Sequence, residues 1–105
     1  MVSRRSLNRE MASEKVAILF YLIIEKNGKR MLKPLNFDTK ISLGLVKAIL
    51  DNTVIPSFYD TLSKNLIERG VKPGSKIQIR AKFSDSHNML NPELKGVRVL
   101  CEVNV

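Results

Sequence analysis

Alternating basic residues are the clearest chemical pattern in this sequence. Lys76, Arg80 and Lys82 occupy even positions of the segment Lys76–Phe83, and every odd position of that segment is apolar. A period of two predicts a β-strand whose basic side chains all lie on one face. Cations gathered on an open sheet face can neutralise the phosphates of a nucleic acid. The pattern therefore predicts a phosphate-binding surface.

Two more residues join this predicted surface. Arg98 lies on the polar side of the segment Gly96–Val105, which can pair with the basic strand. Tyr21, or Phe20 in the other register, adds an aromatic ring from the first strand, and such a ring can stack on a base. The competing interpretation is an ordinary solvated face, because charged outward positions are common in half-buried strands.

The N-terminal residues 1–14 predict a flexible basic arm. Their apolar residues are scattered, and Arg4, Arg5 and Arg9 could add phosphate contacts. A solvated terminus without a ligand explains the same composition. The sequence leaves both interpretations of the arm open.

Length and charge limit the function classes. A chain of 105 residues fits one domain, which we place at residues 15–105, and its 44% apolar content is that of a folded globular protein. The formal charge of +8, from 18 basic and 10 acidic residues, favours polyanions such as RNA or DNA as partners. An inert basic protein is the alternative.

No residue pattern indicates catalysis, a metal or a cofactor. His87 is the only histidine, so a histidine-based metal cluster is excluded, and its neighbours Ser84 and Asp85 are typical of a polar loop. Cys101 stands among valines, where we expect it to act as inert packing. A single cysteine cannot form an internal disulfide, which favours either a reducing, cytoplasmic location or a chain that does not need disulfides for stability.

The most apolar segment is a strand rather than a membrane span. Val16–Ile24 contains nine consecutive apolar residues, far fewer than the roughly 20 that a bilayer requires, and charged residues follow it without a cleavage site. We therefore expect no membrane insertion. Because both faces of this strand are apolar, it should lie in the centre of a sheet.

Turn and capping signals divide the rest of the chain. Asn27-Gly28 predicts a hairpin between strands at Lys15–Glu25 and Lys29–Leu35, and Pro34 should end the second strand or place it at an edge. A helical region follows over Thr39–Arg69, with a cap at Thr39 or Ser42.

Pro56 interrupts this helical region, which is either two helices or one kinked helix. Ser57 and Asp60 suggest the start of a second helix, and Gly70 its end.

The resulting order predicts an α+β fold. It is a β-β-α-(α)-β-β two-layer sandwich, with a four-stranded, mainly antiparallel sheet and the helices on one face. We expect a non-catalytic, basic RNA- or DNA-binding protein, suited to be a component of a ribonucleoprotein. The alternative is a homodimer or an adaptor that binds a protein partner through the apolar sheet face, since an exposed apolar patch usually marks an interface.

Overall fold

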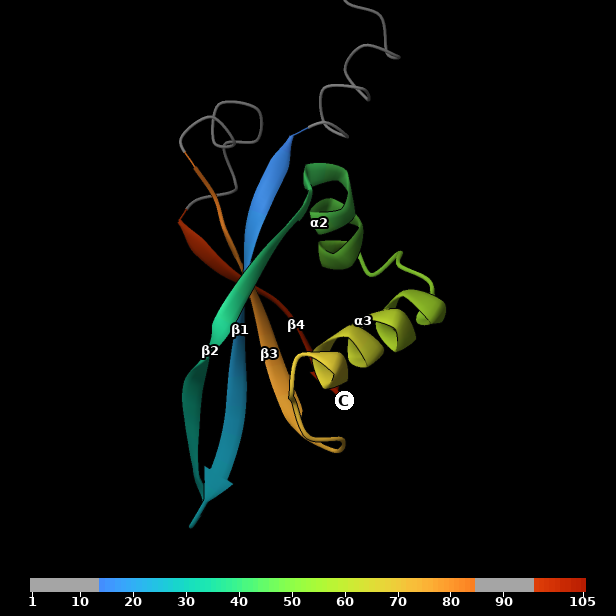
Figure 1. The fold of residues 1–105 in the computed structure, drawn as a ribbon. Helices are drawn as coiled ribbons and strands as arrows, with labels where there is room; N and C mark the ends of the chain where they lie inside the picture. Colours follow the sequence, from blue (N-terminus) through green and yellow to red (C-terminus); the bar gives the residue numbers. More distant parts are fainter. Residues whose placement is uncertain (1–13, 85–95) are drawn as a thin grey trace, which may run out of the picture.

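Four antiparallel strands and two helices form the domain (Figure 1). The computed structural model describes residues 14–84 and 96–105, and its strands pair in the order β2-β1-β3-β4, with both helices on one side of the sheet. This arrangement confirms the predicted α+β fold. The elements are β1 (Lys15–Lys26), β2 (Lys29–Ser42), α2 (Leu43–Leu50), α3 (Pro56–Glu68), β3 (Lys76–Lys82) and β4 (Val97–Asn104).

β1 is a central strand, as its two apolar faces predict. It pairs with β2 on one side and with β3 on the other. Asn27 and Gly28 connect β1 to β2 with positive φ angles of 53° and 73°, which a type I′ hairpin turn requires. The turn therefore fixes the register of the hairpin next to it.

β2 is longer than predicted. The expected end at Leu35 is wrong, because the strand continues through Pro34 to Ser42. β2 is an edge strand. A proline is tolerated there because the N–H that it lacks would face solvent and would not bond to a neighbouring strand. The pairing with β1 shifts by two residues between Leu19 and Tyr21, and residues 35–37 have no partner on β1.

The start of the helical region is also corrected. Thr39 does not cap a helix, because it pairs with Ile18 in the sheet. The alternative cap is confirmed: the Ser42 hydroxyl accepts a hydrogen bond of 3.1 Å from the backbone N–H of Leu45, and α2 begins at Leu43. Pairing of a β-branched residue with a buried strand outweighs the local capping preference.

The helical region forms two helices. Pro56 occupies the first turn of α3, where its missing N–H costs nothing. α3 begins one residue before the predicted start at Ser57, and Ile55 holds the N-cap position without a side-chain bond. Gly70, with a φ of +99°, follows the C-cap residue Arg69, as its position in the sequence predicts.

The hydrophobic core lies between the sheet and the helices. Every second residue of β1 and β3 points into it, and α2 and α3 close it from the other side. Neither helix of the described part of the chain is long and apolar enough to cross a membrane. The buried cluster comprises Val16, Ile18, Phe20, Leu43, Val46, Ile49, Leu66, Val71, Ile77, Ile79, Ala81, Phe83, Leu100 and Val103.

β4 contains an irregularity that changes which side chains face the helices. Ile79 pairs with Cys101, but the next residue, Arg80, pairs with Val99, so Leu100 has no partner on β3. An extra residue reverses the alternation of faces beyond it. The regular alternation of faces is therefore broken at Leu100.

Candidate nucleic-acid interface

The predicted basic surface lies on the side of the sheet opposite α2 and α3, which we call the open face (Figure 1). Lys76, Arg80 and Lys82 all lie on it, because they alternate with the buried residues of β3. Tyr21 lies on the same face, opposite Gln78. The sequence prediction that these four residues share one face of the sheet agrees with the strand pairing.

Arg98 does not join them. It pairs with Ala81, whose side chain is buried on the helix side, whereas Val99 and Val97 take the places opposite Arg80 and Lys82. The irregularity at Leu100 is the physical reason, since it shifts β4 by one residue.

The arm with Arg4, Arg5 and Arg9 lies outside the described residues, as does His87 with its loop.

Three lysines surround a hollow at one end of the open face. Lys15, Lys40 and Lys82 line it together with Glu14, Phe83 and Ser84, and its volume is about 410 Å³. Its floor is Ala17, which pairs with Lys40 on one side and Lys82 on the other. A small side chain between two long cations leaves room for an anionic group.

Sequence reasoning missed Lys15 and Lys40. Lys15 stands at the start of an apolar strand, where it looked like a boundary residue. Lys40 fell inside a segment predicted to be helical. A longer second strand, paired from the Asn27-Gly28 turn, would have placed both lysines on one face.

Arg80 is held in place by two neighbours. Its Cζ lies 4.7 Å from the centroid of the Tyr21 ring, and its Nε donates a hydrogen bond of 2.7 Å to the Gln78 side-chain oxygen. Stacking and the bond together orient the planar guanidinium. Arg80 covers one face of the Tyr21 ring, so a base cannot stack on that face; the guanidinium plane is itself a surface on which bases stack.

A network of polar side chains covers the other half of the open face. The Glu102 carboxylate accepts a hydrogen bond of 2.9 Å from Gln78 and pairs with Arg30, which reaches it from the opposite edge strand. Ile23 on β1 is only 7% exposed, although it faces away from the helices. The network therefore gives the open face a charge-balanced half and a basic half.

Lys76 belongs to the balanced half. Its Nζ lies 3.7 Å from a Glu25 carboxylate oxygen, and both side chains are substantially exposed. Exposed pairs of this kind contribute little to stability, but the nearby negative charge lowers the local positive potential. Lys76 is thus a weaker candidate for phosphate binding than Arg80 or Lys82.

Glu102 makes the stability of the domain depend on pH. Its hydrogen bond with Gln78, and then its bond and charge interaction with Arg30, lower the pKa of the Glu102 carboxyl below the ordinary value of 4.5. A lowered pKa stabilises the fold above the ordinary value, and this stabilisation is lost as the pH falls through the lowered pKa. We expect the free energy of unfolding of Glu102→Gln to lie below that of the native chain at pH 7, and the difference to shrink below about pH 4.5.

Urea unfolding at a series of pH values measures this effect. Glu68→Gln, which removes an exposed acid of α3, is the control for loss of one negative charge. A difference between Glu102→Gln and the native chain that stayed constant from neutral to acid pH would contradict the role given to the Glu102 carboxylate.

Cys101 has the chemistry of a packing residue. It lies partly buried against the core, and burial, followed by the nearby Glu102 charge, raises the pKa of its thiol to about 11. A thiol with this pKa is almost entirely protonated at neutral pH and a poor nucleophile.

Within residues 14–84 and 96–105, no group of three or more histidine, cysteine, aspartate or glutamate side chains is placed to hold a metal ion. Arginine and lysine side chains instead dominate the half of the open face around Ala17. Searches of protein-family models, of curated proteins and of solved structures find no match to this chain.

Proposed function

We propose that the open face binds single-stranded RNA or DNA, without catalysis, mainly through the phosphates. The observation that carries the proposal is the cluster of Lys15, Lys40 and Lys82 around Ala17, with Arg80 beside it. We call these four residues the basic cluster. A role as a component of a ribonucleoprotein fits a small basic domain of this kind.

Three charges of the basic cluster, those of Lys40, Arg80 and Lys82, have no carboxylate partner in the described part of the chain. Positive charge that is not balanced by a carboxylate favours an anionic ligand and gives a salt-dependent affinity.

The spacing of the charges favours a chain of phosphates over a single one. Arg80 and Lys82 are two residues apart on one strand, a separation of about 6.7 Å, and Lys40 lies two strands from Lys82, about 9.6 Å away. Successive phosphates of a flexible single strand can occupy such positions together, whereas one inorganic phosphate reaches only part of the cluster.

Salt dependence tests this proposal. If all four cations contact phosphates, the logarithm of the affinity should fall against the logarithm of salt concentration with a slope of about −2.8. The affinity for a labelled RNA of about 12 nucleotides, a length within the usual range for single-strand binding folds, should then drop about 50-fold between 50 and 200 mM salt. Fluorescence anisotropy measures it, and a slope near zero would contradict phosphate binding.

The exposed valines of β4 favour a second candidate function, a homodimer or protein-interaction module. Val97 and Val99 are 50% and 44% exposed on the open face, along an edge strand. Apolar side chains in such a position are typical of interfaces. Light scattering during size-exclusion chromatography distinguishes the two candidates: a stable dimer without affinity for RNA or DNA at about physiological salt would favour this second function.

A further inference from the structure

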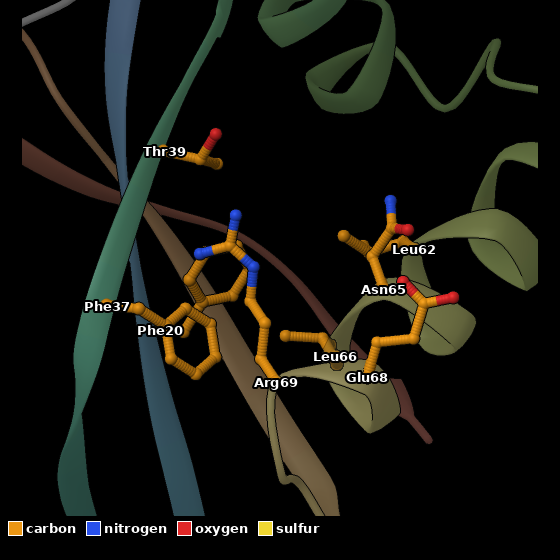
Figure 2. A pocket seen from close by; sticks show the side chains of 8 residues that line it. All are labelled: Phe20, Phe37, Thr39, Leu62, Asn65, Leu66, Glu68 and Arg69. Carbon is orange, nitrogen blue, oxygen red and sulfur yellow. The ribbon is translucent and has the colours of Figure 1, made fainter.

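A pocket on the helix side of the sheet has the features of a small-molecule site. It lies between β2 and the C-terminal half of α3 and has a volume of about 280 Å³ (Figure 2). A neighbouring hollow of about 430 Å³ shares Phe37 and Arg69 with it. Phe37 belongs to the part of β2 that has no partner on β1, so the irregular pairing helps to shape this pocket.

The floor of the pocket is apolar and aromatic. The rings of Phe20 and Phe37 lie 5.3 Å apart with an angle of 42° between their planes, and Leu62 and Leu66 from α3 complete the floor. An enclosed cavity of roughly 150 Å³ accepts benzene. The pocket is therefore large enough for a ligand with one or two fused aromatic rings.

The rim of the pocket carries a cation. The Cζ atom of Arg69 lies 5.1 Å from the centroid of the Phe37 ring, and in the described residues no carboxylate pairs with Arg69. Figure 2 shows the Arg69 guanidinium on the side of the phenylalanine rings and the Glu68 carboxylate directed away from them. Stacking on Phe37 orients the guanidinium and leaves its N–H groups for a ligand.

We propose that this pocket binds a small aromatic carboxylate. Its ring would pack against Leu62 and the part of Phe37 that Arg69 leaves uncovered, and its carboxylate would accept hydrogen bonds from Arg69, with Thr39 and Asn65 as further polar partners at the rim. A neutral aromatic molecule would cover part of Arg69 without supplying a counter-ion, and a simple anion would leave the pocket volume beside Leu62 and Phe37 unfilled. Only a ligand with both parts satisfies both features.

This proposal is independent of nucleic-acid binding. Phe20 faces the helices, whereas the basic cluster lies on the opposite side of the sheet. Substitution of Arg69 should leave RNA binding by the open face intact, so the two proposals can fail separately.

The test uses 1-naphthoate as the probe and nuclear magnetic resonance of the full chain as the readout. The expected result is chemical-shift change at Phe37, Leu62 and Arg69, with a dissociation constant of about 1 mM, since about 13 non-hydrogen atoms contribute about 0.3 kcal/mol each. Arg69→Gln should weaken binding at least about tenfold, because a hydrogen bond to a charged group is lost. Arg69→Lys, which keeps the charge but not the planar fork, should bind between the two.

Matched controls make the result decisive. Lys64→Gln removes another exposed cation of α3 and should leave 1-naphthoate binding unchanged. Acetate and the neutral 1-naphthalenemethanol should both bind more weakly than 1-naphthoate. Equal binding of the neutral alcohol would overturn the proposal, and so would an unchanged affinity in Arg69→Gln. The absence of chemical-shift changes up to about 10 mM 1-naphthoate, which is ten times the dissociation constant expected from its size, would also overturn it.

Discussion

Reversing the charges of Arg80 and Lys82 together is expected to weaken RNA binding about 100-fold at low salt. Each residue would lose a charge-assisted contact worth about 1.5 kcal/mol, so that about 3 kcal/mol of binding energy disappears before any repulsion is counted. With two of the four contacts of the basic cluster removed, the salt slope should also fall from about −2.8 to about −1.4. Anisotropy titrations of R80E/K82E at several salt concentrations measure both quantities.

The control must separate position from total charge. K64E/K72E changes the net charge by the same amount, but Lys64 lies on α3 and Lys72 in the connection that follows it, away from the basic cluster. This variant should bind RNA nearly as well as the native chain. Equal losses in the two variants would show that net charge alone attracts RNA and would remove the open face as a specific site.

A second charge-reversal variant separates the loss of RNA binding from any loss of folding. Arg80 contacts Tyr21 and Gln78, so its substitution also disturbs the packing of the open face. Lys40 and Lys82 are exposed, and K40E/K82E keeps both contacts of Arg80. This variant should retain the native thermal transition and lose affinity by a similar factor.

Leu66→Ala is expected to lower the free energy of unfolding by about 3 kcal/mol. Leu66 is only 1% exposed and fixes α3 against the sheet within the buried cluster. Replacing a buried leucine by alanine costs about 2–5 kcal/mol, because apolar contacts are lost and a cavity remains. For a domain with about 5–15 kcal/mol of total stability, this is a large fraction.

Urea unfolding followed by circular dichroism measures this loss. With a denaturant dependence of about 1.5 kcal/mol per molar, the midpoint should fall by about 2 M. The neighbouring residue supplies the control: Ile67 is 41% exposed, and Ile67→Ala should change the stability by less than about 0.5 kcal/mol. Similar losses at both positions would contradict the packing of α3 described for this fold.

The two halves of the open face explain why only part of its positive charge is proposed to bind. Glu102 and Glu25 balance Arg30 and Lys76 on the half of the open face that contains Ile23. The half around Ala17 has its three lysines at the end of the sheet. Sequence charge alone predicts a uniform basic face, whereas pairing across the sheet divides it.

Local sequence determined the features that depend on neighbouring residues. The alternation in Lys76–Phe83, the Asn27-Gly28 turn, the Ser42 cap and the Gly70 stop each need only a few positions of the chain, and all four are present in the structure. The shared face of Lys76, Arg80 and Lys82 follows from the first of them.

Tertiary structure decided everything that depends on strand pairing. β2 extends to Ser42 because it continues to pair with β1 beyond Pro34, and the two-residue shift at Leu19–Tyr21 places Lys40 beside Ala17. The face of Arg98 follows from the single extra residue at Leu100. Side chains alternate with a period of two, so one extra residue moves every following side chain to the other face, and no local signal marks where that residue falls. The bond from Arg30 to Glu102 likewise joins side chains of the two edge strands, and these two residues, 72 positions apart in the chain, meet only because the sheet brings them together.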